Sequence, residues 1–120
     1  MVELAALAPG GPYQRGFAGD SFNTAVYLAR AGLQVDYLTR LGDDPLSGDI
    51  LRMLTAEGIG TGLVTQGPGR QPGLYLIDTD ADGERRFSYG RDRAPVRDMF
   101  EQPLAVDGID ALYFTGITLA

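Results

Sequence analysis

Residues 18–25 are Ala18-Gly19-Asp20-Ser21-Phe22-Asn23-Thr24-Ala25, and they predict a tight turn that leads directly into a helix. Gly19 permits a positive φ and lets a ligand approach bare backbone. Asp20 and Ser21 are both candidate N-caps, and Asn23 would lie in the first turn, where backbone amides are unpaired. A small ligand rich in hydroxyls fits such a place. Taken alone, the stretch fits an ordinary helix cap better than a binding site.

Composition excludes several kinds of function. The chain has 120 residues, 44% of them hydrophobic, which is enough for one modest folded domain. It has no cysteine, histidine or lysine, so disulfides, a histidine base, Schiff-base chemistry and a Walker A loop are excluded. A net charge of −6 argues against non-specific nucleic-acid binding. The absence of a long apolar run and of a signal-peptide pattern predicts no membrane contact. The absence of cysteine fits the cytoplasm.

The ten basic residues are all arginines, and five of them lie between positions 85 and 97. A cluster of guanidinium groups in an acidic chain indicates recognition of a specific anion. A solvated strand and loop, in which these arginines pair with nearby Asp and Glu residues, explains the cluster about as well.

Periodicity predicts an α/β chain. Strands are expected over 2–7, 13–17, 35–41, 73–78, 86–91 and 109–115, and a Gly/Pro loop over 66–71. One helix is expected over 22–31, ending at Gly32. A second helix should begin at Asp44 as N-cap with Pro45 at the first helical position, and end at Gly58. Residues 80–83 predict the turn of a hairpin.

The spacing after the opening stretch strengthens the case for a site. Asn23 and Ala25 are followed by Gly32 and Gly42, a pattern that resembles the N-terminal signature of the ribokinase-like (PfkB) carbohydrate kinases. Residues 19–30 are most similar to the 2-keto-3-deoxygluconate kinases within this family. One departure is Ala18, where the family usually has a first glycine.

The hairpin carries the second half of the resemblance. Residues 72–77, 82–85 and Tyr89-Gly90-Arg91 resemble the lid of 2-keto-3-deoxygluconate kinases, in which an aromatic residue usually stands where this chain has Gly90. By strand alternation that position points away from Tyr89 and Arg91. Residues 114–118 also match the strand end of the family, so the resemblance covers nearly the whole chain.

The resemblance assigns substrate-binding roles to six residues, and each role has a physical basis. Arg91 can pair with the carboxylate of a sugar acid at two points. Tyr75 and Tyr89 offer rings for the carbon face of the sugar and hydroxyls for hydrogen bonds, although plain strand packing would also explain them. Gly19, Asp20 and Asn23 would hold hydroxyl groups, and capping alone would account for Asp20.

The fold implied by the resemblance is a partial three-layer α/β/α body with a small β-sheet lid. The body would comprise about 1–8, 21–64 and 94–120, and the lid about 12–18 and 72–91. ATP and Mg²⁺ would be bound in the full-length enzyme and not by this segment. No catalytic residue and no metal ligand is expected before Ala120, so the segment alone should be inactive. A homodimer or higher homo-oligomer is expected through the lid, because a two-stranded hairpin with open edges is marginal alone.

Three functions therefore remain open. The first is the sugar-acid-binding part of a kinase that phosphorylates 2-keto-3-deoxygluconate at its terminal hydroxyl with ATP. The second is another ribokinase-like kinase, of the ribokinase or fructokinase type, although a neutral sugar gives Arg91 no carboxylate to bind. The third is a non-catalytic module for binding or dimerisation.

Overall fold

The computed structural model describes residues 1–101, 103–104 and 107–119, and its two main helices form where local chemistry predicts them. Helix α1 spans Asp20–Arg30 and helix α2 spans Pro45–Ala56. Asp44 caps α2, since its side chain accepts hydrogen bonds from two amides of the first turn, with Pro45 next to it. Neither helix, nor any shorter one in the described part of the chain, has the length and apolar character needed to cross a bilayer.

The two helices pack together around a small core. Its buried members come from α1, α2, a strand and the loop after α2, and they are Phe22, Ala25, Val26, Leu41, Ile50, Leu54 and Ile59. Leu54 is completely buried, as expected for a residue on the inner stripe of an amphipathic helix. This packing fixes α1, and with it the turn at residues 18–20, relative to the rest of the fold.

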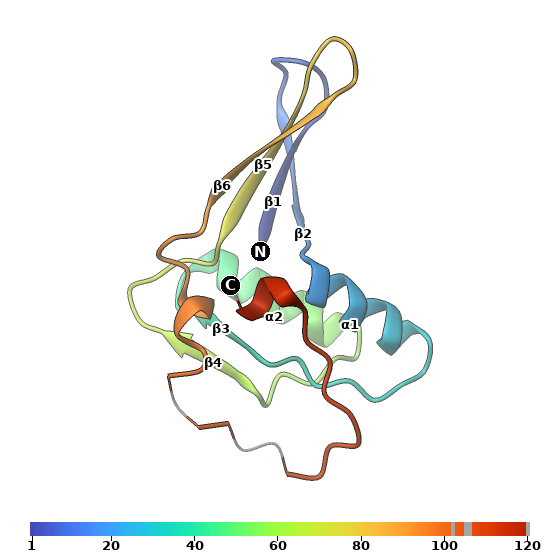
Figure 1. The fold of residues 1–120 in the computed structure, drawn as a ribbon, viewed down its shortest axis with the longest axis vertical. Helices are drawn as coiled ribbons and strands as arrows, with labels where there is room; N and C mark the ends of the chain where they lie inside the picture. Colours follow the sequence, from blue (N-terminus) through green and yellow to red (C-terminus); the bar gives the residue numbers. More distant parts are fainter. Residues whose placement is uncertain (102, 105–106, 120) are drawn as a thin grey trace.

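A parallel two-stranded sheet lies beside the helices. Strand β3 (Thr39–Gly42) is joined through α2 to β4 (Val64–Gly67), which gives the strand–helix–strand unit of an α/β protein (Figure 1). The α/β class is thereby confirmed. Strand β4 was not expected, because its glycine and the Gly/Pro residues that follow indicate a loop. Glycine avoids a tight contact there, since a Cβ on Gly67 would lie 3.3 Å from the Cβ of Pro95.

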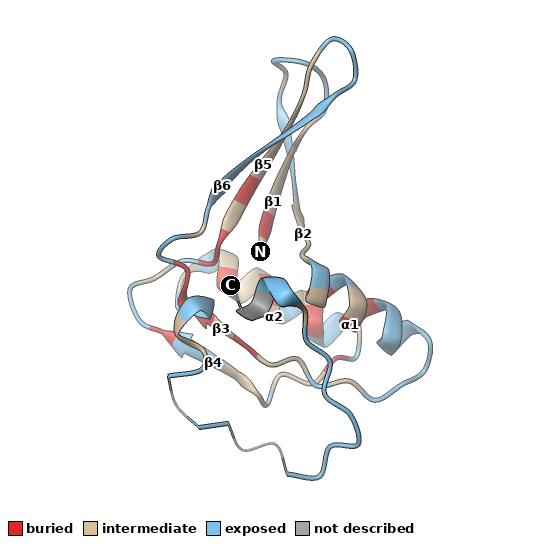
Figure 2. Cartoon of the chain, in the orientation of Figure 1, coloured by how far each residue is buried: buried red, intermediate tan, exposed pale blue. Residues whose placement is uncertain are grey.

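A second sheet of four strands rises from one end of the molecule (Figure 1). Its order is β2 (Tyr13–Phe17), β1 (Val2–Ala6), β5 (Leu74–Thr79) and β6 (Arg85–Gly90). Strands β1 and β2 form one antiparallel hairpin, β5 and β6 form another, and the parallel pair β1–β5 joins them. Figure 2 shows that β6 and the hairpin tips are exposed, whereas the lower parts of β1 and β5 are buried.

The sequence groups residues 1–8 with the body segments 21–64, but the structure pairs β1 with the strands at 13–17 and 74–79. Strand β1 lies inside the four-stranded sheet, between β2 and β5. The connection from β1 to β2 is short and is closed by a hydrogen bond of 2.9 Å from the Leu7 amide to the Pro12 carbonyl. A strand tied to its neighbour by so tight a turn must share that neighbour's sheet.

The strand expected over 109–115 is also absent, although the structure describes all of these residues. Ile109, Leu112, Tyr113 and Phe114 are at least 40% exposed, and the segment leads into a 3₁₀ helix at Gly116–Leu119. Apolar sequence alone does not make a strand, since a strand needs a neighbouring edge to pair with. In the described part of the chain, β3 and β4 pair with each other and with no third strand.

Candidate functional site

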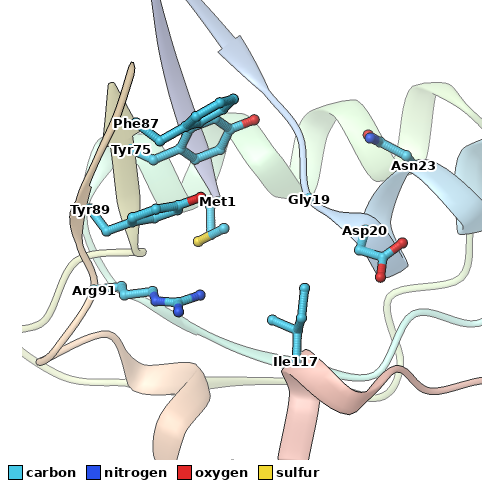
Figure 3. A pocket seen from close by; sticks show the side chains of 9 residues that line it. All are labelled: Met1, Gly19, Asp20, Asn23, Tyr75, Phe87, Tyr89, Arg91 and Ile117. Carbon is cyan, nitrogen blue, oxygen red and sulfur yellow. The ribbon is translucent and has the colours of Figure 1, made fainter. Parts of the chain in front are cut away.

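A pocket lies between the base of the four-stranded sheet and the start of α1 (Figure 3). Its volume is about 250 Å³, which suits a small ligand. Nine residues line it: Met1, Gly19, Asp20, Asn23, Tyr75, Phe87, Tyr89, Arg91 and Ile117. The structure thus brings all six residues of the sequence prediction around one space, from segments more than fifty positions apart. Their role in binding a ligand stays a prediction.

One side of the pocket is the turn into α1. Gly19 has a φ of 147°, a conformation that favours glycine, and it occupies the N-cap position. The expectation that Asp20 or Ser21 caps the helix is wrong, because the helix begins at Asp20 and no side chain caps it. Ser21 instead shares a hydrogen bond of 3.0 Å with the hydroxyl of Tyr37.

This shift leaves polar groups available at the rim of the pocket. Asp20 and Asn23 are both exposed, and the hydrogen bonds that they form within the described residues use their backbone: the Asn23 amide donates to the Gly19 carbonyl at 2.8 Å, and the Asp20 carbonyl accepts from the Thr24 hydroxyl at 3.1 Å. A carboxylate accepts hydrogen bonds, and an amide side chain both accepts and donates them. The pair therefore offers donors and acceptors to hydroxyl groups of a ligand, and its binding role stays a prediction.

The opposite side of the pocket is an aromatic wall formed by Tyr75, Phe87 and Tyr89. Tyr75 and Tyr89 are cross-strand partners on β5 and β6, and their ring centroids are 6.1 Å apart. Phe87 lies 6.3 Å from Tyr89 and 6.4 Å from Tyr75, measured between centroids. Figure 3 shows the three rings side by side above Arg91. Such a wall offers an apolar surface to the carbon face of a ligand.

Tyr75 differs from its neighbours in being buried and hydrogen-bonded. Only 9% of it is exposed, and its hydroxyl donates a hydrogen bond to the carboxylate of Glu3 on β1. Burial, with a further contribution from the Glu3 contact, raises the pKa of the Tyr75 phenol well above its ordinary value. Tyr75 therefore stays protonated and neutral throughout the physiological pH range.

Arg91 supplies positive charge at the foot of the wall. Its guanidinium carbon lies 5.0 Å from the centroid of the Tyr89 ring, in cation–π contact. Gly73 makes room for it, since a Cβ at position 73 would lie 3.1 Å from the Cβ of Arg91. Within the described residues Arg91 forms no ion pair, so its fork of donors is available for a ligand carboxylate.

The other clustered arginines do not converge on the pocket. Arg86 pairs at 3.7 Å with Asp80 at the hairpin turn, as expected for a solvated strand. Arg93 is exposed, and its carbonyl accepts hydrogen bonds from the side chain of Arg70. The cluster is therefore divided: Arg91 faces the pocket, where anion recognition stays a prediction, whereas Arg86 and Arg93 lie on the surface of the fold.

Phe87, Met1 and Ile117 line the pocket but were not among the predicted site residues. Phe87 could have been found, because it lies two positions before Tyr89 and alternation puts both on one face. Ile117 reaches the pocket from the 3₁₀ helix at Gly116–Leu119, and its position depends on tertiary folding that no local pattern reports.

The arrangement can bind a small anionic polyol, with a cation at one end, aromatic rings along one side and hydroxyl-binding groups opposite. The described residues do not fit the Mg²⁺ that the resemblance implies for the full-length enzyme. Among them there is no group of three Asp, Glu, His or Cys side chains placed to hold a metal ion. No phosphoryl-transfer step is therefore assigned to this chain.

Comparison with known proteins gives a consistent answer. The family described as pfkB family carbohydrate kinase matches residues 5–120. A 2-dehydro-3-deoxygluconokinase from Dickeya dadantii (strain 3937) is 40% identical over 130 aligned positions, which cover 100% of this chain and 41% of that protein. A PfkB protein from Polaromonas sp. JS666 matches with a TM-score of 0.73 and 29% identity over 80% of this chain and 34% of that one.

A fructokinase from Xylella fastidiosa with bound ATP shares the fold, with a TM-score of 0.72 and 24% identity over 80% of this chain and 29% of that one. The chain thus spans less than half the length of the relatives that it matches. Since the family match covers nearly all of it, the chain belongs to the pfkB family of carbohydrate kinases.

Proposed function

We propose that this chain is the sugar-acid-binding part of a kinase that transfers the γ-phosphoryl group of ATP to the terminal hydroxyl of 2-keto-3-deoxygluconate. The single observation that carries the proposal is Arg91, a guanidinium that lies at the foot of an aromatic wall and has no acidic partner among the described residues. A sugar acid supplies the carboxylate that such a group binds best. The similarity to a 2-dehydro-3-deoxygluconokinase supports this choice of substrate.

The remaining pocket residues receive roles from their positions. Tyr75 and Tyr89 would lie against the carbon face of the sugar. Asp20 and Asn23, on the far side of the pocket, would bind hydroxyl groups, and bare backbone at Gly19 would let the sugar approach the helix end. These interactions bind and orient the substrate, so they contribute by positioning the hydroxyl that reacts.

The proposal places the phosphoryl donor, its Mg²⁺ and the catalytic base in the rest of the protein. Phosphoryl transfer depends on groups that surround the nucleotide phosphates, and the described residues offer no cluster of side chains for a metal ion. The relative with bound ATP supports nucleotide use by the whole enzyme. Turnover by the 120-residue chain alone would contradict this division.

The test is substrate choice by the full-length protein. ADP release should be measured with 2-keto-3-deoxygluconate, fructose and ribose at equal concentrations, each with MgATP. We expect kcat/KM to be highest for the sugar acid, because only that substrate uses Arg91. Faster turnover of fructose or ribose would favour the alternative, a kinase of the fructokinase or ribokinase type, which the likeness to a fructokinase fold also allows. Binding of the sugar acid without ADP release would favour the non-catalytic module.

We also propose that the four-stranded sheet is a lid over the pocket and a dimerisation surface. Every residue of β6 is exposed, and 49% of Phe87 and 57% of Tyr89 are exposed on its face. Exposed aromatics beside an unpaired strand edge favour a partner. Light scattering of the full-length protein should report a homodimer or a higher homo-oligomer, and a strictly monomeric profile at high concentration would refute the proposal.

A further inference from the structure

Glu3, a charged residue outside the pocket, is hydrogen-bonded to the hydroxyl of Tyr75, which lines it. Glu3 on β1 is the parallel register partner of Tyr75 on β5, and Tyr75 is in turn the partner of Tyr89 on β6. Register partners on neighbouring strands point to the same face of a sheet, so these side chains form one row. Tyr75 lines the pocket and Glu3 does not. The Tyr75 hydroxyl donates a hydrogen bond to the Glu3 carboxylate.

The sheet leaves space for this carboxylate. Gly16 is the partner of Glu3 on β2, and even a Cβ on it would be in ordinary van der Waals contact, 3.6 Å from Oε1 of Glu3. The other oxygen, Oε2, accepts the hydrogen bond from the Tyr75 hydroxyl. Tyr75 is nine-tenths buried, and its ring is held between Phe87 and Tyr89 on one side and β1 on the other. Its hydroxyl therefore has little freedom to turn elsewhere.

This contact determines what Tyr75 can offer to a ligand. A phenol has one proton to donate and lone pairs that accept. Once the proton is directed to Glu3, the oxygen can only accept, so it suits a hydroxyl of the sugar and repels a carboxylate. Arg91, at the foot of the wall, is cationic and only donates hydrogen bonds, so it attracts a carboxylate.

We propose that Glu3 is a positioning residue: it holds the Tyr75 hydroxyl as a hydrogen-bond acceptor for a substrate hydroxyl, and so directs the substrate carboxylate to Arg91. The inference rests on the proposed function, because it takes a sugar acid as the ligand. The raised pKa of Tyr75, to which burial contributes most and Glu3 next, agrees with a phenol that keeps its proton beside a carboxylate.

The test is a double-mutant cycle in the full-length protein, with the dissociation constant for 2-keto-3-deoxygluconate as the readout. Glu3→Ala should weaken binding about tenfold, the size expected for a lost charged hydrogen bond that fixes a binding group. Glu3→Gln keeps an acceptor within reach and should restore most of the affinity. In a Tyr75→Phe background, Glu3→Ala should cost less than about twofold more. Glu84→Ala, at an exposed position of the turn between β5 and β6, is the control and should leave affinity unchanged.

A second readout needs no ligand. The ¹³Cζ signal of Tyr75 at neutral pH, assigned with Tyr75→Phe, should move toward that of a free phenol in Glu3→Ala and stay in Glu84→Ala. Unchanged affinity in Glu3→Ala, or an equal loss in both tyrosine backgrounds, overturns the inference, because Glu3 would then act on the ligand directly or on the fold. If the unmodified protein does not bind the sugar acid, the proposed function is wrong. The contact between Glu3 and Tyr75 is tested separately, and it is wrong if the Tyr75 signal does not move in Glu3→Ala.

Discussion

Replacing Arg91 with lysine tests the carboxylate assignment most directly. Lysine keeps the positive charge, so any loss must come from geometry. A guanidinium offers two parallel donors to a carboxylate, whereas an ammonium acts as a point charge. Arg91 also packs its guanidinium 5.0 Å from the Tyr89 ring, which limits its movement and fixes the direction of its donors. Arg91→Lys should therefore weaken the sugar acid and leave ATP almost unaffected.

The size of the effect follows from one lost charged hydrogen bond. Such a bond contributes about 1.5–3 kcal/mol when its partner is desolvated. Arg91 is half-buried and the pocket opens to solvent, so the lower end of that range applies. A loss of about 1.5 kcal/mol corresponds to roughly a tenfold rise in KM for the sugar acid.

Arg93→Lys is the matched control, since Arg93 is exposed two positions further on and does not line the pocket. KM for the sugar acid and for ATP should be measured separately in both variants of the full-length protein. If Arg91→Lys leaves KM for the sugar acid unchanged while Arg93→Lys raises it, the carboxylate is assigned to the wrong arginine. If neither variant changes KM, the carboxylate is bound by another part of the protein.

The remaining predictions concern stability, measured as urea unfolding of the full-length protein. Leu54→Ala should lower the free energy of unfolding by about 2–5 kcal/mol, because Leu54 is completely buried; a loss below about 1 kcal/mol would show that the core is poorly packed. Asp44→Ala should cost about 1 kcal/mol, since the Asp44 carboxylate accepts from the Leu46 amide at 2.9 Å, whereas Asp44→Asn should retain most of the stability. Arg30 lowers the pKa of Glu57 through a hydrogen-bonded ion pair, so this pair stabilises the fold above the unfolded pKa of Glu57 and the stabilisation is lost as pH falls through the lower, folded pKa. Glu57→Gln should remove this part of the dependence on pH, and an unchanged acid profile would refute the pairing.

Local chemistry predicted the helices well. Asp44 with Pro45 defines one end of α2, and the positive φ of Gly58 defines the other. Gly32 ends α1 in the same way. These signals succeed because capping involves neighbours in sequence, so nothing distant has to be known. The start of α1 was misplaced by one or two residues, since Gly19 can cap a helix without any side chain.

The strands were harder to predict because their pairing is not local. Residues 2–6 have the same apolar pattern whether they join one sheet or the other, and only the tight connection to β2 distinguishes the two. Residues 109–115 have strong β character, yet no strand of the described chain pairs with them. Residues 64–67 have weak β character and form a strand because β3 provides an edge. Strand propensity thus reports suitability for a sheet, and tertiary contacts decide membership.

The pocket depends both on local motifs and on long-range contacts. Gly19 and Asn23 were identified from one motif, and Tyr75, Tyr89 and Arg91 from another, but only folding could show that the two motifs meet. Glu3 was not identified at all. Its importance comes from the parallel register that puts it opposite Tyr75, and nothing in the residues around either position encodes that register.

The parallel pairing of β1 with β5 also sets the order in which the molecule can assemble. Val2 and Leu74 are register partners although they are 72 positions apart, so their contact closes a very long loop. Each hairpin of the four-stranded sheet closes only a short loop, although it is marginally stable alone, whereas their union closes a long loop and is expected to form more slowly. On the ribosome the first hairpin is made well before its partner emerges, and its inner edge stays open to other chains in that interval. We therefore expect the aromatic side of the pocket to form last. In refolding followed by hydrogen exchange, the backbone amides that join β1 to β5 should be the last to become protected.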